Sequence, residues 1–366
     1  MTVADRPAGA PSDRTAAVLE GLAGCVPPRR VPNAELPAAW GVDDAWVRRR
    51  TGVATRHWAG TGVRTGDLAL EAAGRVLAGL EGPEPDTVLV ATSTPDRPMP
   101  AMAPHLAARL GLGPVAAWDV AAACSGFGYG LAAAAGALAA GHARRVLLVA
   151  AEVYSTLVDP ADRAAGVVFA DGSGAVLLRR GTYGEPGSLL AFDLGSDGSG
   201  HELIQVPGGG AAERAGPLGD APADRHFRMA GRAVYQHAVV RMTESSRRVL
   251  ARTGWSTDDV DRFVAHQANA RILDAVGERL RLPAARQVSN IERVGNTGAA
   301  SLPLALADAA SRAELDVGAK VLLTSFGAGL TWASATLLWP DLPAVAPVDA
   351  GVTPVGTDAA PATACP

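Results

Sequence analysis

The sequence is poor in lysine, in cysteine and in long apolar runs. Lys320 is the only lysine among 33 cationic residues, so arginine carries nearly all of the positive charge. Arginine favours bidentate contacts with phosphates and carboxylates, although a GC-rich coding bias explains the same composition equally well. The net charge of −4 excludes a strongly cationic nucleic-acid-binding protein. Only local arginine clusters therefore bear on function.

The three cysteines, Cys25, Cys124 and Cys365, lie far apart and form no CxxC pair. This spacing excludes a disulfide framework and a zinc knuckle. No apolar stretch is long enough to span a bilayer, and the N-terminus lacks the charged-then-apolar pattern of a signal peptide. We therefore expect a cytoplasmic protein in a reducing compartment, with neither membrane nor nucleic acid among its partners.

Apolar residues make up 48% of the chain and occur in short, regular runs. A chain of 366 residues with this content buries a large core, in one large or two medium domains. Runs of β-branched residues alternate with helical segments rich in Ala and Leu, which predicts an α/β fold with buried strands at 87–91, 145–150, 262–265 and 320–324. Residues 1–13 and 342–366 lack periodicity and are expected to be flexible tails.

The sequence between the tails repeats itself in order. Cys124 is followed by a small-residue helix, predicted at 131–141, and then by strands at 146–149 and 171–178. Asn296 is followed by a small-residue helix at 298–310 and by strands at 321–323 and 331–338. We infer two similar halves, residues 14–185 and 186–341. Equivalent strand ends in the two halves could then meet at one central cavity.

Cys124 lies where a short apolar strand runs into small residues and an alanine-rich helix. The positive end of a helix stabilises thiolate over thiol, so the position suits a nucleophile with a lowered pKa. The segment alone leaves a second interpretation open, because most unpaired cysteines are small buried hydrophobes. Cys365 lies in a predicted tail, which argues against a catalytic role for it.

Four motifs place Cys124 in a family context. They are Cys124 itself, the His266-Gln-Ala-Asn-Ala-Arg271 run, the Gly-Asn296-Thr-Gly-Ala-Ala-Ser301 run, and Phe326-Gly-Ala-Gly-Leu-Thr-Trp332. In order and spacing they resemble β-ketoacyl-ACP synthase III, the initiating condensing enzyme of the thiolase superfamily, over about residues 18–340. The resemblance implies a thiolase fold: two βαβαβαβ halves related by a pseudo-twofold axis, stacked in five αβαβα layers, usually as a homodimer.

The resemblance also implies a mechanism. Cys124 would attack an acyl-CoA thioester, and the backbone N–H groups of Cys124 and Ala328 would hold the oxyanion. Malonyl-ACP would then lose carbon dioxide, and the resulting enolate would attack the acyl-Cys. His266 and Asn296 are the expected donors to the enolate oxygen, because a neutral imidazole and an amide donate without charge. The family usually has Gly where this chain has Ala328.

Matching positions predict the substrate contacts. Trp46 and Arg50 would sandwich the CoA adenine, an arrangement that cation–π stacking supports. Further family positions near CoA and its pantetheine are Arg163, Met229, Ala230 and Gly231. For the arginines, a solvated surface cluster is the alternative.

Other positions bear on the acyl pocket, the carrier protein and the dimer. Phe169 would lie deep in the acyl pocket. Met99 would cross the dimer interface to close the partner's pocket, and a flexible Met there favours a starter larger than acetyl. Arg271 matches a position that contacts acyl carrier protein. Arg279 and Arg281 could extend this basic patch, whereas Gln236 replaces a basic residue usual in relatives.

Two other functions are alternatives to decarboxylative condensation. An acyltransferase on the same fold would pass the acyl group from Cys124 to a hydroxyl or amine, and the retained Asn296 argues against it. A non-catalytic subunit would be expected to have lost Cys124 or His266. No metal and no separate cofactor are implied, because Gln205 stands where a zinc motif after His201 needs its second His. The remaining histidines are interpreted as structural or exposed: His57, His105, His142, His201, His226 and His237.

Overall fold

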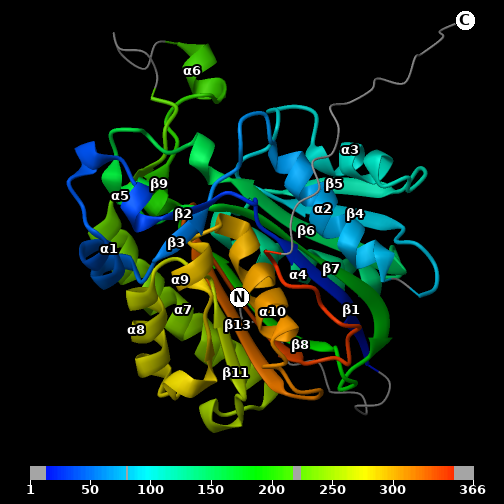
Figure 1. Ribbon diagram of the computed structural model, residues 1–366. Helices are drawn as coiled ribbons and strands as arrows, with labels where there is room; N and C mark the ends of the chain where they lie inside the picture. The colour runs from blue at the N-terminus through cyan, green and yellow to red at the C-terminus, as the bar shows by residue number, and fades with distance from the viewer. Residues whose placement is uncertain (1–13, 80, 217–223, 350–366) are drawn as a thin grey trace, which may run out of the picture.

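Two mixed five-stranded sheets form the framework of the molecule (Figure 1). The computed structural model describes residues 14–79, 81–216 and 224–349. The strands of the first sheet, in spatial order, are β1 (Thr15–Cys25), β7 (Asp171–Thr182), β6 (Arg145–Val153), β4 (Thr87–Ala91) and β5 (Ala116–Val120). Those of the second are β8 (Leu189–Ser196), β14 (Thr331–Leu338), β13 (Lys320–Gly327), β11 (Arg262–Ala265) and β12 (Gln287–Val288). The two sheets thus have equivalent strand orders, as the internal repeat predicts.

Helices form three further layers around the sheets. On the outer face of the first sheet lie α2 (Thr65–Ala78) and α3 (Met102–Arg109). Between the sheets lie α4 (Gly126–Ala139) and α10 (Ser301–Ser311), and α7 (Gly231–Thr253) covers the far face of the second sheet with α8 (Ala270–Leu280) beside it (Figure 1). The order of layers is therefore αβαβα, and the predicted thiolase architecture is confirmed.

The two central helices are short of bulky side chains because both of their faces are covered. In α4, a Cβ on Gly128 would lie 2.6 Å from the Ala333 side chain, and one on Gly130 would lie 2.6 Å from Leu148. Residues Ser301 to Ala309 of α10 are all buried. Small residues let the helices approach both sheets closely, which holds the start of each central helix in a fixed place.

The predicted strands agree with the structure and mostly extend further. β4 and β11 have the predicted bounds, whereas β6 continues to Val153 and β13 to Gly327. Helix α4 begins five residues before the predicted 131, directly after the short helix η4 (Ala123–Ser125) that contains Cys124. Cys124 therefore precedes the helix N-terminus, as expected.

Part of the predicted C-terminal tail packs onto the fold. Val348 is 3% exposed, and its carbonyl accepts a hydrogen bond from the amide of Val26 at the end of β1. The expectation of a mobile segment from 342 onward is therefore wrong for this stretch, because Val348 adds apolar contacts to the side chains around Gly24. The predicted tails at 1–13 and 350–366 lie outside the described residues.

The remaining elements are shorter. They are β2 (Arg30–Pro32), β3 (Thr55–His57), β9 (Ile204–Gln205), β10 (Arg228–Met229), α1 (Asp44–Thr51), α5 (Arg163–Gly166), α6 (Ala211–Ala215) and α9 (Ile291–Val294), with 3-10 turns η2 (Asn33–Glu35), η3 (Ala38–Trp40), η5 (Tyr154–Thr156), η6 (Gly198–Leu203), η7 (Thr257–Asp259), η8 (Ala284–Arg286) and η9 (Gly298–Ala300). No helix in the described ranges is both long and apolar enough to cross a bilayer.

Candidate active site

Cys124 sits in a tight turn between β5 and α4. Ala123 has a φ of 45°, a conformation that costs a non-glycine residue about 1–3 kcal/mol and is kept only where surrounding contacts enforce it. Ser125 Oγ donates to the carbonyl of Thr331, and Thr331 Oγ1 donates to the carbonyl of Ala122, each at 3.1 Å. Two hydrogen bonds to the second half thus flank the nucleophile and fix its backbone.

The end of β13 approaches Cys124 so closely that it needs a glycine. A Cβ on Gly327 would lie 2.7 Å from the Cys124 amide nitrogen and 3.1 Å from that of Ser125. These are backbone atoms that cannot give way without moving the turn. Ala328 follows Gly327 and lines the same cavity as Cys124, where its amide is expected to serve the oxyanion.

His266 follows β11 and is held by its backbone and its ring. Its amide donates to the Thr324 carbonyl at 2.8 Å, and its Nδ1 pairs with the Ser301 hydroxyl at 2.5 Å. A hydroxyl both donates and accepts, so Ser301 can support either neutral imidazole tautomer. Nε2 therefore remains available to accept a proton from Cys124 or to donate to substrate.

Asn296 is fixed across the two halves of the chain. Its amide donates to the Val168 carbonyl and its own carbonyl accepts from the Ala170 amide, at 2.9 and 2.8 Å. The side-chain Oδ1 accepts from the Gly298 amide at 3.0 Å, while Nδ2 lies 3.5 Å from the Ala268 carbonyl. That second contact is long, so Nδ2 keeps donor capacity for a substrate oxygen.

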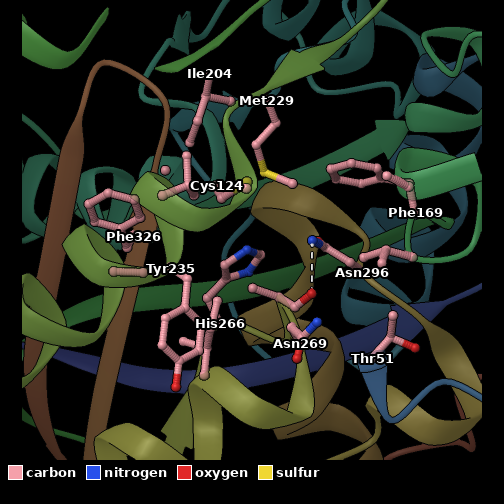
Figure 2. Close-up of a pocket in the computed structure, with 18 of the residues that line it drawn as sticks. Thr51, Cys124, Phe169, Ile204, Met229, Tyr235, His266, Asn269, Asn296 and Phe326 are labelled. Carbon is pink, nitrogen blue, oxygen red and sulfur yellow. Dashed lines mark hydrogen bonds between the residues drawn. The ribbon is translucent and has the colours of Figure 1, made fainter. Parts of the chain in front are cut away.

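One cavity of about 660 Å³ joins these groups. Figure 2 shows the His266 imidazole and the Asn296 amide pointing into this cavity, with Cys124, Phe169, Met229 and Phe326 also around it. The structure therefore brings the three predicted catalytic side chains together. The predicted contacts that also line the cavity are Ala328, Trp46, Arg50, Met229, Gly231, Phe169 and Arg271.

The thiol of Cys124 does not have the lowered pKa that its place at a helix start predicts. The surrounding protein excludes water, and this desolvation raises the pKa of Cys124 to about 12, with the carboxyl of Glu152 adding to the rise. A hydrogen bond from Tyr154 acts in the opposite direction. The sequence expectation is thus wrong for the resting protein, because burial outweighs the helix terminus. The proton must leave during attack rather than before it.

Desolvation keeps His266 neutral. The ring is 3% exposed, and burial lowers its pKa to about 3. Glu152 lies buried behind the site, where its carboxyl accepts from the Ser93 amide at 3.0 Å and the Thr94 hydroxyl at 2.7 Å, and burial raises its pKa to about 7. A neutral imidazole suits both roles assigned to His266, as a base for the thiol and as a donor to an enolate.

We expect the decarboxylation step to be insensitive to pH where an ordinary histidine titrates. Because the pKa of His266 is lowered to about 3, acidification from pH 8 to 5 leaves the ring neutral. The rate of malonyl-carrier decarboxylation by a Cys124→Ala variant should therefore show no inflection near pH 6.5. If the rate shows an inflection near pH 7 that disappears in Glu152→Gln, the titrating group is the Glu152 carboxyl. A fall in the rate near pH 6.5 that persists in Glu152→Gln would contradict the neutral-imidazole assignment.

The predicted adenine-binding residues Trp46 and Arg50 both line the cavity. The guanidinium carbons of Arg50 and Arg163 lie 4.9 and 5.5 Å from the centre of the Trp46 ring. Arg163 also donates from Nη1 to the Trp40 carbonyl at 3.1 Å, and it does not line the cavity itself. The sandwich of a purine by Trp46 and Arg50 stays a prediction.

Besides Arg163, two predicted contacts lie outside the cavity. Met99 is 84% exposed and does not line the pocket of its own chain. Ala230, between two lining residues, is absent from the lining and donates from its amide to the Leu203 carbonyl. None of the six non-catalytic histidines reaches the cavity. Within the described chain, no group of three or more His, Cys, Asp or Glu side chains is placed to hold a metal ion.

Several residues that line the cavity were not predicted from the sequence. Tyr154, Phe227 and Tyr235 form aromatic walls, and Asn269 lies beside Asn296 (Figure 2). Asn269 belongs to the His-Gln-Ala-Asn run, so this motif could have identified it as a site residue. Its Nδ2 donates to the Arg50 carbonyl at 3.0 Å. Tyr154 and Phe227 stand in segments without any motif, and only the folded chain brings them to Cys124.

Family comparisons agree with this geometry. Residues 118–198 match the family model for 3-oxoacyl-[acyl-carrier-protein] synthase III, and residues 250–339 match its C-terminal model. A Streptomyces coelicolor protein named beta-ketoacyl-[acyl-carrier-protein] synthase III 5 is 52% identical over 90% of this chain and 99% of its own length. A synthase III from Pseudomonas aeruginosa is 49% identical over 89% of this chain and 98% of its own.

Solved structures give the same result. The crystal structure of 3-oxoacyl-(acyl carrier protein) synthase III from Pseudomonas aeruginosa superposes with a TM-score of 0.84 at 47% identity, covering 90% of this chain and 99% of that one. The priming β-ketosynthase of the R1128 polyketide pathway gives a TM-score of 0.82 at 31% identity, covering 92% and 100%. The chain therefore belongs to the 3-oxoacyl-[acyl-carrier-protein] synthase III family of condensing enzymes.

Proposed function

We propose that this enzyme condenses an acyl-CoA starter with malonyl-ACP, releasing carbon dioxide and β-ketoacyl-ACP, to initiate fatty-acid or type II polyketide synthesis. The observation that carries the proposal is the composition of the cavity. Cys124, His266 and Asn296 line it together, and none of the residues that line it is Asp or Glu. A nucleophile and two uncharged donors suit the stabilisation of an enolate, whereas a carboxylate in the cavity would repel a malonyl group.

In the first half-reaction, Cys124 sulfur attacks the thioester carbonyl while His266 Nε2 takes the thiol proton. The carbonyl oxygen becomes an oxyanion held by the amides of Cys124 and Ala328. When the tetrahedral intermediate collapses, the CoA sulfur leaves with its electron pair and the proton returns to it from His266. The products are acyl-Cys124 and free CoA.

In the second half-reaction, the carbon–carbon bond to the malonyl carboxylate breaks and its electron pair forms a thioester enolate. Nε2 of His266 and Nδ2 of Asn296 donate to the enolate oxygen. The enolate carbon attacks the acyl carbonyl, and Cys124 leaves as a thiolate that takes up one proton from solvent. The CoA thioester and the carrier phosphopantetheine are substrates, so the chemistry uses no separate cofactor.

Contact with the carrier protein is proposed for the exposed arginines on and after α8. Arg271 lines the cavity with its guanidinium 5.8 Å from the Tyr235 ring centre, and Arg279 and Arg281 are exposed at the opposite end of α8. Carrier proteins are acidic, so this face would attract them electrostatically.

Reversing the charge at Arg271 is expected to weaken carrier binding. Arg271→Glu should raise KM for malonyl-ACP roughly tenfold and reduce its salt dependence, because one attractive contact becomes repulsive. Cys124 acylation by a short acyl-CoA should change less than twofold. Arg180→Glu, an exposed arginine on β7 that does not line the cavity, is the matched control. Equal KM changes in both variants would rule out a carrier contact at Arg271.

A homodimer is proposed through the free edge of the first sheet. β5 is an edge strand, its Trp118 is 40% exposed, and Met99 projects at 84% exposure. Pairing of two β5 edges would cover these side chains and could bring Met99 to the acyl pocket of the partner. We place the enzyme in the cytoplasm, in line with its three widely spaced cysteines.

The test is a panel of acyl-CoAs of different length and branching, with intact mass recorded before and after addition of malonyl-ACP. The expected result is an acyl adduct on the Cys124 peptide that disappears as carbon dioxide and β-ketoacyl-ACP form. The panel also identifies the starter. Absence of any adduct would contradict the proposal, and transfer of the adduct to an alcohol or amine without decarboxylation would select the acyltransferase instead.

A further inference from the structure

Arg56 on β3 is a buried cation whose hydrogen bonds go to uncharged acceptors. Its side chain is fully buried. Nη2 donates to Asn33 Oδ1 at 2.5 Å and to the Val167 carbonyl at 3.2 Å, and Nη1 donates to the Val31 carbonyl at 3.3 Å. Burial lowers the pKa of Arg56 to about 10, so the guanidinium stays charged at neutral pH. Burying a charge among neutral acceptors is costly, which points to a role for the groups that it holds together.

Asn33 extends the contact of Arg56 to both ends of α1. While its Oδ1 accepts from Arg56, its Nδ2 donates to Asp44 Oδ1 at 2.8 Å and to the Val53 carbonyl at 2.9 Å. Asp44 is the first residue of α1, and Val53 follows the C-terminal cap of that helix. One amide side chain therefore joins Arg56 to the start and the end of the helix that carries Trp46.

The second bond of Arg56 Nη2 reaches α5. Val167 is the C-terminal cap of α5, so its carbonyl lies at the end of that helix. Arg163 is the first residue of α5, and its guanidinium lies 5.5 Å from the centre of the Trp46 ring on α1. The Arg56 guanidinium is therefore bonded to both of the helices whose side chains meet at Trp46.

The apolar support of α1 and α5 is a small hydrophobic cluster, separate from the larger clusters of the core. Its buried members are Val31, Leu36, Trp40, Val47 and Val167. Because the hydrophobic contribution to stability grows with the apolar area that is buried, a cluster of this size constrains the two helices weakly. Their relative position then depends on the hydrogen bonds of Arg56 and Asn33.

We propose that Arg56 is a positioning residue for the nucleotide end of the substrate site. Its guanidinium holds α1 and α5 at a fixed spacing, which places the predicted adenine contacts Trp46 and Arg50 beside Arg163. Arg56 does not line the cavity, so it acts through the two helices and does not touch the substrate. The inference rests on the proposed function for the identity of the nucleotide, which is that of coenzyme A.

The test compares Arg56→Lys with wild type on two thioesters of the same acyl group, acyl-CoA and acyl-pantetheine, which lacks the nucleotide. Lysine keeps the charge, but an ammonium group lacks the planar fork that binds Asn33 and the Val167 carbonyl together. We expect the half-saturating concentration of acyl-CoA for acylation of Cys124 to rise roughly tenfold, and that of acyl-pantetheine to change less than about twofold. The maximal acylation rate should stay near that of wild type, because Arg56 is not part of the acylation chemistry.

Hydrogen exchange measured by mass spectrometry gives a second readout that needs no substrate. Arg56→Lys should raise amide exchange in α1 and in α5, because both helices lose a contact. Asn33→Asp keeps an acceptor for Arg56 but loses the Nδ2 donor to Asp44 and Val53. It should therefore raise exchange in α1 and not in α5, and weaken the use of acyl-CoA selectively. This variant decides the question alone if Arg56→Lys does not fold.

Arg286→Lys is the matched control. Nη1 of Arg286 donates to the carbonyls of Asp258 and Val260, both at 2.9 Å, and Arg286 does not line the cavity. This change also removes a guanidinium that joins backbone carbonyls, but at a distance from α1 and α5 in the sequence. Both half-saturating concentrations should stay within about twofold of those of wild type.

An equal rise for acyl-CoA and acyl-pantetheine in Arg56→Lys overturns the proposal, because the loss would then be general. Unchanged exchange in α1 and α5 of a folded Arg56→Lys also overturns it. If wild type has the same half-saturating concentration for both thioesters, CoA is not recognised by its nucleotide and the proposed substrate contact fails. Raised exchange confined to α1 and α5 would in that case still sustain the positioning of the two helices by Arg56.

Discussion

Replacing Cys124 with alanine is expected to lower the condensation rate by at least about 10³-fold, because the residue that carries the acyl group is lost. The turn should survive, since its backbone is held by the contacts of Ser125 and Thr331 and not by the sulfur. Decarboxylation of malonyl-ACP should persist in part, because His266 and Asn296 remain in place. The variant separates the acyl-carrying function from enolate stabilisation.

Intact mass and product formation measure this effect directly. Wild type should gain one acyl group from the starter CoA, and Cys124→Ala should gain none. Cys25→Ala is the matched control: Cys25 is fully buried, is not among the residues that line the cavity, and burial raises its pKa to about 12. An acyl adduct that survives in Cys124→Ala, or vanishes in a folded Cys25→Ala, would show that the nucleophile is misassigned.

Replacing Asn296 with aspartate is expected to slow condensation about 10²- to 10³-fold while leaving acylation of Cys124 nearly unchanged. Aspartate can still accept from the Gly298 amide, so the loop keeps its hydrogen bond. It has lost the Nδ2 donor, and its carboxylate would repel both the malonyl carboxylate and the enolate. The selective loss follows because the attacked carbonyl in the first half-reaction is held by backbone amides.

Single-turnover kinetics resolve the two steps. Burst acylation by starter CoA reports the first, and carbon dioxide release after malonyl-ACP addition reports the second. Asn269→Asp is the charge control: it also places a carboxylate on the cavity and keeps the Oδ1 that caps α8 by accepting from the Arg271 amide. It should slow carbon dioxide release less than Asn296→Asp, because Asn296 Nδ2 is still present. Should Asn296→Asp impair both steps equally, the assignment of Asn296 to the enolate would be wrong.

The sequence predicted most of the framework because buried strands have a simple pattern. The bounds of β4 and β11 followed from runs of Val, Leu, Phe and Ala between helical segments, and the internal repeat is in line with two sheets of equivalent strand order. Cys124, His266 and Asn296 were predicted from motifs at strand ends, where equivalent turns of the two halves meet. Local pattern was sufficient there because the strand–turn–helix geometry is itself local.

Properties that depend on several distant segments could not be predicted. Desolvation by the surrounding protein raises the pKa of the Cys124 thiol, whereas the helix terminus alone predicted that this pKa would be lowered. Tyr154 lines the cavity where Phe169 and Phe227 pack against its ring and Gly298 leaves room for it, and no motif spacing in the sequence predicts these contacts. The expectation that residue 348 lies in a flexible tail was wrong for a related reason. A Pro- and Ala-rich segment without periodicity still places a single apolar side chain, that of Val348, in the core.

The most direct test of the central claim is the ratio of carbon dioxide released to β-ketoacyl-ACP formed in one reaction with starter CoA and malonyl-ACP. Condensation through acyl-Cys124 and a decarboxylated enolate predicts one carbon dioxide for each β-ketoacyl product, with one free CoA released beforehand. Transfer of the starter acyl group to an acceptor with no carbon dioxide released would contradict the account.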